Sequence, residues 1–268
     1  MDKLEYIDAN ARIRACRGLL GELTRHALHG YVPNSVPRVI IYQHRDNGAE
    51  AQFYNGAIYS WGIKSPSVKD EVYAHEYFHA AQHEYRERTE GSGSADVPSA
   101  VKVYSDGTLA EAGANKRSII WNAMNEAGAY LFGFYNAYIA QHGDEKYSAK
   151  IAAALFLRFT EDYGVEIGDA YGKLMKTVLT AGLDTPEEIR SVAKPGRNAS
   201  SRVALAALFA GLIYEMDGFD MGRAFADLLR SPDSNIARIL SLGTQGADEH
   251  FTNLQMHLLG LSGIVRNV

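Results

Sequence analysis

The stretch from Ser65 to Arg88 reads SPSVKDEVYAHEYFHAAQHEYRER, and the rest of the chain is organised around it. Ser65 and Pro66 indicate a helix start, with a hydroxyl residue at the N-cap and proline at the first helical position. No glycine or proline follows until Gly91, so the sequence predicts one continuous helix. Its apolar residues gather on one side, which predicts a face packed on the core: Ala74, Tyr77, Phe78, Ala81 and Tyr85.

The other side of this helix carries an HExxH motif at residues 75–79. His75 and His79 are four residues apart, so both imidazoles lie on the same side of the helix and can bind one metal ion. Glu76 lies on the same rim, where its carboxylate can accept a proton from a metal-activated water. Catalytic zinc takes three protein ligands and keeps one position for water, so the motif predicts a zinc hydrolase whose third ligand lies elsewhere.

His83 is not a candidate for that third ligand. It follows His75 by eight residues, about 12 Å further along a continuous helix. Ligands of one zinc ion lie within roughly 4 Å of one another. Two later stretches read Glu-Ala-Gly-Ala, beginning at Glu111 and at Glu126, and their small residues would let a second helix approach closely. We favour Glu126, because a carboxylate buried in an apolar helix needs a cation, and Glu111 remains the alternative. The apolar neighbours of Glu126 in the sequence are Trp121, Met124, Tyr130 and Leu131.

A small sheet is predicted ahead of the HExxH helix. Residues 38–43 (RVIIYQ) are rich in β-branched residues, and residues 51–61 (AQFYNGAIYSW) divide at Asn55-Gly56, a strong hairpin signal. We expect residues 57–63 to form the exposed edge strand. An extended peptide could pair with such an edge and lie over the metal.

The remaining chain is predicted to be mostly helical. An amphipathic helix at residues 9–29, begun by Asp8, precedes the sheet, and a long apolar helix runs from about Asn115 to Gly143. We expect residues 90–100 to be a linker and residues 101–104 a short strand. Further helices are expected at 150–163, 170–181, 185–192, 200–216, 219–230, 234–242 and 247–260, of which 200–216 is apolar on nearly all sides and should be central.

These elements predict an α+β fold with a small sheet packed on the HExxH helix and a mostly helical C-terminal part. We expect residues 1–143 to form the catalytic domain and residues 144–268 a helical domain that closes the cleft, or both to form a single domain. The chain has 46% hydrophobic residues, 22% charged residues and a net charge of −5, and it lacks a basic cluster, which argues against nucleic acid as a partner.

The longest apolar run, residues 203–214, is too short to span a bilayer. The first residues lack the apolar segment of a signal peptide, so we expect a cytoplasmic protein, or one exported without such a peptide, and no membrane partner. Cys16 is the single cysteine, so the chain has no internal disulfide. It falls within a helical pattern and is predicted to fill the core.

Residues 75–82 (HEYFHAAQ), the preceding sheet and a later Asn125-Glu126 in a helix resemble the gluzincins, the zincin metallopeptidases with a glutamate ligand. They also resemble bacterial metallopeptidase domains of unassigned substrate. The resemblance covers about residues 38–138. It implies that His75, His79 and Glu126 bind Zn²⁺, with Glu76 as general base in the hydrolysis of a protein or peptide substrate.

One position departs from the gluzincin pattern. Gluzincins carry an aspartate four residues after the ligand glutamate, which orients a ligand histidine, and here that position is Tyr130. We assign Tyr130 to this place and to the catalytic residues, although a phenol offers a hydrogen bond without a charge. Asn115 has the same offset from Glu111. Several residues remain open as donors to the oxyanion: Tyr130, Tyr135, His142, His250 and His257.

The sequence therefore predicts a zinc metallopeptidase. The alternative is a zincin-like domain without peptidase activity that acts as a binding or structural module. The intact His75, Glu76 and His79 favour the enzyme, because a decayed site often loses its base first, whereas the missing aspartate favours the alternative.

Overall fold

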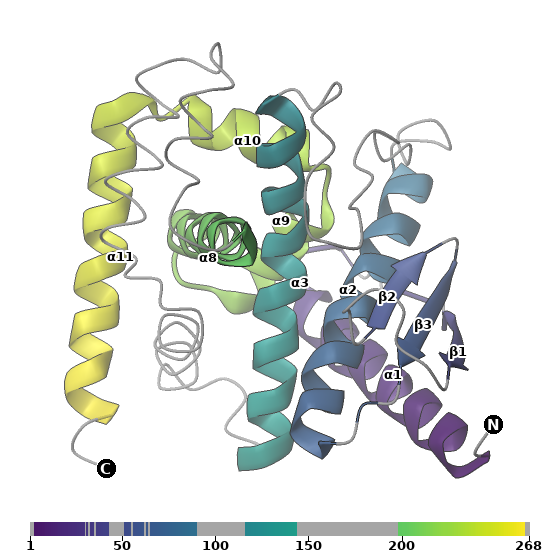
Figure 1. The fold of residues 1–268 in the computed structure, drawn as a ribbon. Helices are drawn as coiled ribbons and strands as arrows, with labels where there is room; N and C mark the ends of the chain where they lie inside the picture. Colours follow the sequence, from purple (N-terminus) through teal and green to yellow (C-terminus); the bar gives the residue numbers. More distant parts are fainter. Residues whose placement is uncertain are drawn as a thin grey trace.

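The computed structural model describes residues 3–29, 31, 33–34, 36–42, 51–54, 56–61, 63, 65–89, 116–143 and 198–265. Within these ranges the chain forms seven helices and one three-stranded mixed sheet, which confirms a mostly helical α+β protein (Figure 1). Some predictions lie outside the described residues: Glu111, Asn115, the linker 90–100, the strand 101–104 and the helices 150–163, 170–181 and 185–192. Among the described residues, no helix combines the length and the apolarity that a membrane crossing requires.

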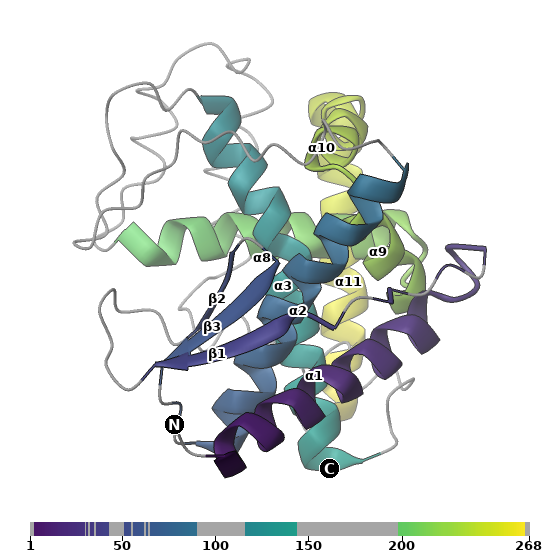
Figure 2. The ribbon, with the colours of Figure 1, turned by 90° about the vertical axis from the view of Figure 1, so that its right-hand side faces the viewer.

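The sheet consists of β1 (Arg38–Tyr42), β2 (Ala51–Tyr54) and β3 (Ala57–Trp61). The predicted hairpin is present, with Gly56 at a positive φ of 76° in the turn between β2 and β3. β1 pairs with the other side of β3 in parallel, so the strand order is β1-β3-β2 (Figure 2). The expectation that residues 57–63 form the edge is therefore wrong. β3 is the central strand, and the edge beside α2 is β2.

The HExxH helix is α2 (Pro66–Thr89), which begins where Ser65-Pro66 predicts. The carbonyl oxygen of Ser65 accepts a hydrogen bond from the Lys69 N–H at 2.9 Å, as expected of an N-cap. The side chains predicted to face the core are largely enclosed, with Tyr77 and Phe78 both at 0% exposure. One face of α2 therefore packs on the core, and the histidines of the motif lie on another face.

Helix α1 (Lys3–Thr24) packs along α2, but its bounds differ from the predicted 9–29. Asp8, taken as the start signal, lies inside the helix, where its carboxylate pairs with Arg12 at 3.1 Å and with Lys69 of α2 at 3.2 Å. The chain leaves the helix after Thr24, and His29 has a positive φ of 50°. Cys16 is 1% exposed, which confirms its predicted place in the core.

Helix α3 (Lys116–His142) lies against α2 because two glycines remove the side chains that would separate them. A Cβ added at Gly133 would lie 2.9 Å from the carbonyl oxygen of Glu71 and 3.4 Å from Cβ of His75. A Cβ at Gly128 would meet the Phe78 ring at 2.3 Å. Both contacts are shorter than van der Waals packing allows. At position 133 the contact is with backbone, so the two backbones can come this close only with glycine there, whereas a side chain at position 128 would require the Phe78 ring to move.

The C-terminal helices are α8 (Asn198–Met216), α9 (Met221–Leu229), α10 (Pro232–Leu240) and α11 (Gly243–Val265), within a few residues of the predicted bounds. Residues 205–215 of α8 are all buried, and Figure 1 shows this helix end-on between α3 and α11. Its predicted central position is confirmed. Buried apolar residues from α1, the sheet, α2, α3 and α8–α11 form a single cluster, so the described helices after residue 197 share a core with the part that precedes residue 144.

Candidate metal centre

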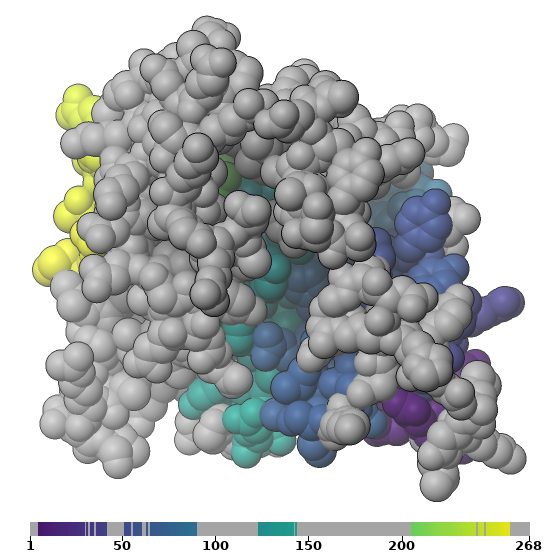
Figure 3. Space-filling view, in the orientation of Figure 1, coloured from purple at the N-terminus to yellow at the C-terminus, as the bar shows by residue number. Residues whose placement is uncertain are grey.

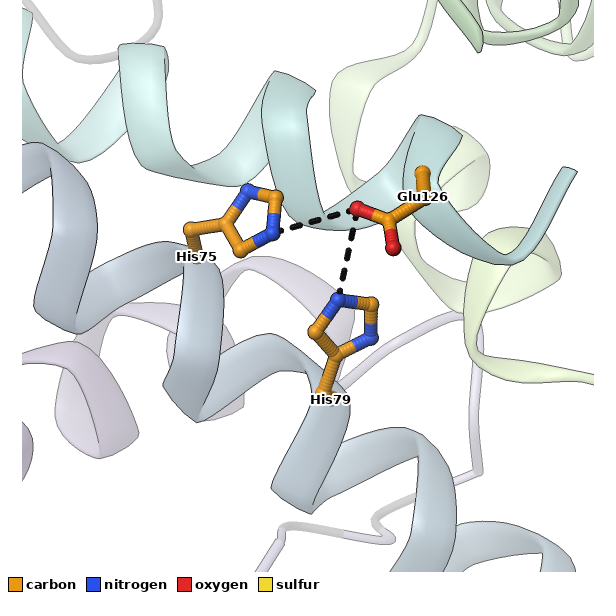
Figure 4. A group of neighbouring side chains, drawn as sticks. All are labelled: His75, His79 and Glu126. Carbon is orange, nitrogen blue, oxygen red and sulfur yellow. Dashed lines mark ion pairs between the residues drawn. The ribbon is translucent and has the colours of Figure 1, made fainter. Parts of the chain in front are cut away.

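The structure brings together His75 and His79 of α2 with Glu126 of α3 (Figure 4). Glu126 Oε2 lies 3.2 Å from Nε2 of His75 and 3.6 Å from Nε2 of His79. Three ligand atoms from two helices thus point at one small volume. They lie within 4.8 Å of one another, and within the described residues they are the one such group of at least three His, Cys, Asp or Glu side chains.

These separations suit a zinc ion. Ligands at 2.0–2.2 Å from a tetrahedral metal are separated from one another by about 3.3–3.6 Å. The two imidazole–carboxylate separations, 3.2 and 3.6 Å, are close to this value. Two imidazole nitrogens and one carboxylate oxygen are also a donor set typical of catalytic zinc, with one coordination position left for water. The residues therefore fit the metal that the motif predicts.

The surroundings of Glu126 are more open than the prediction of a carboxylate buried in an apolar helix implies. Its side chain is 20% exposed, and those of His75 and His79 are each 15% exposed. Met124 and Leu131, which are neighbours in the sequence, lie in the core. A helix turns by about 100° per residue, so apolar neighbours in sequence bury their own sides of α3 without enclosing Glu126. Figure 3 shows atoms of α2 (blue) and α3 (teal) at the surface of one face.

The charge of Glu126 and the charges of the two histidines depend on one another in this triad of His75, His79 and Glu126. Burial opposes the charge on Glu126, but the adjacent His79 and His75 outweigh this effect and hold the pKa of the carboxyl well below its usual range. Burial likewise opposes the charge on His79, yet the Glu126 carboxylate raises the pKa of this imidazole. The Glu126 carboxylate is thus ionised, and its negative charge favours a cation at this point, either a protonated imidazole or a metal ion.

Glu76 is 8% exposed and lies between α2 and the sheet. Its Oε2 accepts a hydrogen bond from the backbone N–H of Phe53 in β2 at 2.5 Å. Phe53 pairs with Ile58 of β3 and precedes Tyr54, the last residue before the turn, so its N–H points away from β3. The side of β2 that faces away from β3 is therefore joined to the predicted general base by one hydrogen bond.

Gln82 is a residue of the site whose role the sequence reasoning did not assign. It is 1% exposed, and its Oε1 lies 3.0 Å from Nδ1 of His79. Its Nε2 donates to the carbonyl oxygens of Asn125 at 3.1 Å and of Leu228 at 2.9 Å. The spacing of three residues between His79 and Gln82 could have indicated this contact, since residues three apart lie on the same face of a helix.

Tyr130 lies beside the triad, with its ring 4.7 Å from that of His75 in an edge-to-face arrangement. The other proposed oxyanion donors have different surroundings. Tyr135 is buried against Phe225 in the core. Two residues of α11 contact side chains away from the triad, namely His250 with Glu215 and His257 with Phe219. The side chain of His142 lies outside the described residues.

His83 has the position that the helical rise predicts. Its side chain is 41% exposed and lies 3.6 Å from Glu87, and the triad of ligand atoms does not include it. Comparison with known proteins adds no further constraint on the site: no family model, no curated protein and no solved structure matches this chain.

Proposed function

We propose that this protein is a zinc-dependent metallopeptidase in which His75, His79 and Glu126 bind the metal and Glu76 is the general base. The observation that carries the proposal is the approach of Glu126 to Nε2 of both histidines, at 3.2 and 3.6 Å, from a separate helix. HExxH alone occurs by chance in helices that bind nothing. Here a second helix, α3, places a carboxylate beside both histidines, so a chance occurrence of the motif is a poor explanation.

The protein residues divide the chemistry among them. Bound zinc would polarise the scissile carbonyl group and acidify a water molecule. The Glu76 carboxylate is held through Oε2 by Phe53, and in this proposal Oε1 takes the proton from the water and passes it to the leaving amine. Tyr130 lies against His75 and is the residue that we propose as oxyanion donor.

The sheet supports an extended peptide as the substrate. β2 is an edge strand, and its Phe53 amide touches Glu76. A peptide paired alongside β2 would run past the general base and the three ligands, since edge strands bind extended chains through their backbone groups. This proposal replaces the edge predicted at residues 57–63 with β2.

Metal analysis combined with a cleavage assay tests the function. We expect about one zinc per chain after purification, and cleavage of a mixed peptide library that a chelator abolishes and added zinc restores. The double variant His75→Ala/His79→Ala should lose both the bound zinc and the cleavage activity. A control, His83→Ala, removes a histidine of the same helix outside the triad and should keep both. Absence of stoichiometric metal from zinc-replete preparations would refute the proposal, whereas bound zinc without cleavage would favour the binding-module alternative.

A further inference from the structure

The orientation of the Gln82 amide is determined by the groups around it. One end of the amide faces the carbonyl oxygens of Asn125 and Leu228, at 3.1 and 2.9 Å. Carbonyl oxygens only accept hydrogen bonds, so this end must be the NH₂ group. The other end, at 3.0 Å from Nδ1 of His79, is therefore the amide oxygen. The neighbours of Gln82 thus settle an assignment that the shape of the amide leaves open.

This orientation decides which nitrogen of His79 carries the proton. The Gln82 oxygen only accepts, so Nδ1 of His79 must be the donor and carry its hydrogen. Neutral imidazole carries one N–H, which leaves the lone pair on Nε2. Nε2 is the atom that lies 3.6 Å from Glu126. The nitrogen that faces the candidate metal position is therefore the one able to bind a metal.

A second amide near His79 does not change this conclusion. The Asn125 NH₂ group lies 3.5 Å from Nδ1, at the limit of a hydrogen bond and longer than the 3.0 Å contact with Gln82. The Asn125 oxygen accepts from Nη1 of Arg86 at 3.0 Å, which keeps its NH₂ group on the side of His79. Asn125 thus offers Nδ1 a donor, and the acceptor that His79 requires is supplied by Gln82.

Gln82 is in turn held by α9. Leu228 is near the C-terminal end of this helix and Arg230 follows its last residue, where carbonyl groups lack donors within the helix. Gln82 donates to the Leu228 oxygen, and Arg86, one turn later on α2, donates to the Arg230 oxygen at 3.2 Å. The end of α9 therefore fixes two side chains of the HExxH helix.

We propose that Gln82 is a positioning residue that holds His79 as the Nδ1–H tautomer and presents Nε2 to zinc, and that α9 completes this device. The proposal rests on the zinc site of the proposed function and extends it to α9, which lies outside the region that resembles the gluzincins. Partners of ligand histidines typically change metal affinity by about 10–100-fold when they are removed. We expect a loss of this size without Gln82.

Two substitutions separate positioning from packing. Gln82→Leu removes the acceptor for His79 and both donors, so zinc affinity should fall about 10–100-fold and thermal stability should also fall. Gln82→Glu keeps an acceptor for Nδ1–H but places a carboxylate against two carbonyl oxygens. Its thermal stability should fall, whereas its zinc affinity should stay within about 3-fold of wild type or rise, because a carboxylate makes the imidazole a stronger ligand. Gln245→Leu, an exposed change on α11, is the control and should alter neither quantity.

The measurements are competition titrations of zinc against a chromophoric chelator, melting curves, and ¹⁵N–¹H correlation spectra of the histidine rings in zinc-loaded wild type. The spectra should show His79 with a hydrogen on Nδ1 and the metal on Nε2. They require no variant, so the proposal stays testable if Gln82→Leu fails to fold. Zinc on Nδ1 of His79, or equal zinc affinity in wild type and Gln82→Leu, would overturn the role of Gln82 while leaving the metallopeptidase intact. A wild-type protein that takes up no zinc would instead remove the proposed function itself.

Discussion

Gly133 of α3 and Glu71 of α2 are in backbone contact, so close that a Cβ on Gly133 would lie 2.9 Å from the Glu71 carbonyl oxygen. The same Cβ would lie 3.4 Å from Cβ of His75, one of the three proposed metal ligands. Glu126 lies on the same helix as Gly133, and a short carboxylate side chain reaches Nε2 of His75 only if the two helix axes stay close. The glycine contact thus sets the spacing of the candidate metal centre.

Gly133→Ala should push α3 away from α2. We expect a loss of about 1–3 kcal/mol in the free energy of unfolding and a drop in zinc affinity of at least about tenfold, since the ligand atoms would no longer converge. Chemical denaturation and zinc titration measure the two effects. Gly18→Ala on α1 is the matched control. A Cβ there meets nothing within 4 Å, so this change should stabilise the protein by about 0.5–1 kcal/mol.

Glu126→Ala should weaken zinc binding by at least about 100-fold and remove the rise in melting temperature that added zinc produces. The reason is that Glu126 would supply the anionic ligand of the proposed site, and it lies 3.2 Å from Nε2 of His75. The sequence left open whether Glu111 or Glu126 is the third ligand. Glu111→Ala tests this, and we expect it to bind zinc as tightly as wild type does. Competition titration measures both. A loss of zinc in Glu111→Ala, with none in Glu126→Ala, would reverse the assignment.

Glu76→Gln should keep the fold and the zinc but lower cleavage by at least about 100-fold. An amide oxygen can still accept the hydrogen bond from Phe53, so the contact with β2 survives, but an amide does not take a proton from water. Zinc content, melting temperature and turnover of a library peptide are to be measured on the same preparation. Equal turnover in variant and wild type would remove Glu76 from the mechanism.

Asp217 should make stability depend on pH. Burial and the neighbouring Asp227 raise the pKa of Asp217 from 3.8 to about 6, although Arg238 lies 2.8 Å away. The folded state therefore binds more protons than the unfolded state between about pH 4 and 6, so this residue lowers stability as pH rises through that window and keeps it lower above it.

Asp217→Asn removes this titration, and its amide oxygen can still accept from Arg238. Relative to wild type, the variant should gain about 1–3 kcal/mol between about pH 4 and pH 7. Urea unfolding at both pH values measures the change. A stability difference between variant and wild type that stays the same at both pH values would contradict the assignment.

Cys16 should be unreactive in the folded protein. The thiol is 1% exposed, and burial raises its pKa to about 12, so almost no thiolate is present near neutral pH. A chromogenic aryl disulfide should therefore modify the native protein at least about 100-fold more slowly than the unfolded chain, in which one thiol reacts. Modification at the same rate in buffer and in denaturant would show that the N-terminal helix does not cover this residue.

Local signals in the sequence predicted the elements nearest to the site. The Ser65-Pro66 start, the four-residue spacing of His75 and His79 and the Asn55-Gly56 turn all act within a few residues, and the structure agrees with each. Signals of the same kind misplaced the first helix, because Asp8 is used in ion pairs with Arg12 and Lys69 instead of capping a helix end. A side chain that can cap can also pair across helices, and neighbours distant in sequence decide between the two.

The sequence by itself determined which residues could bind a metal, because helical periodicity alone places His75 and His79 on one face. Only the tertiary structure decided that Glu126 meets them, that β2 and not β3 is the edge beside Glu76, and that Gln82 turns its oxygen to His79. Each of these depends on contacts between segments far apart in the chain: α3 against α2, β1 pairing in parallel with β3, and the end of α9 against α2. Such contacts are set by packing and by hydrogen bonds across the whole core, and a local pattern of residues does not by itself determine them.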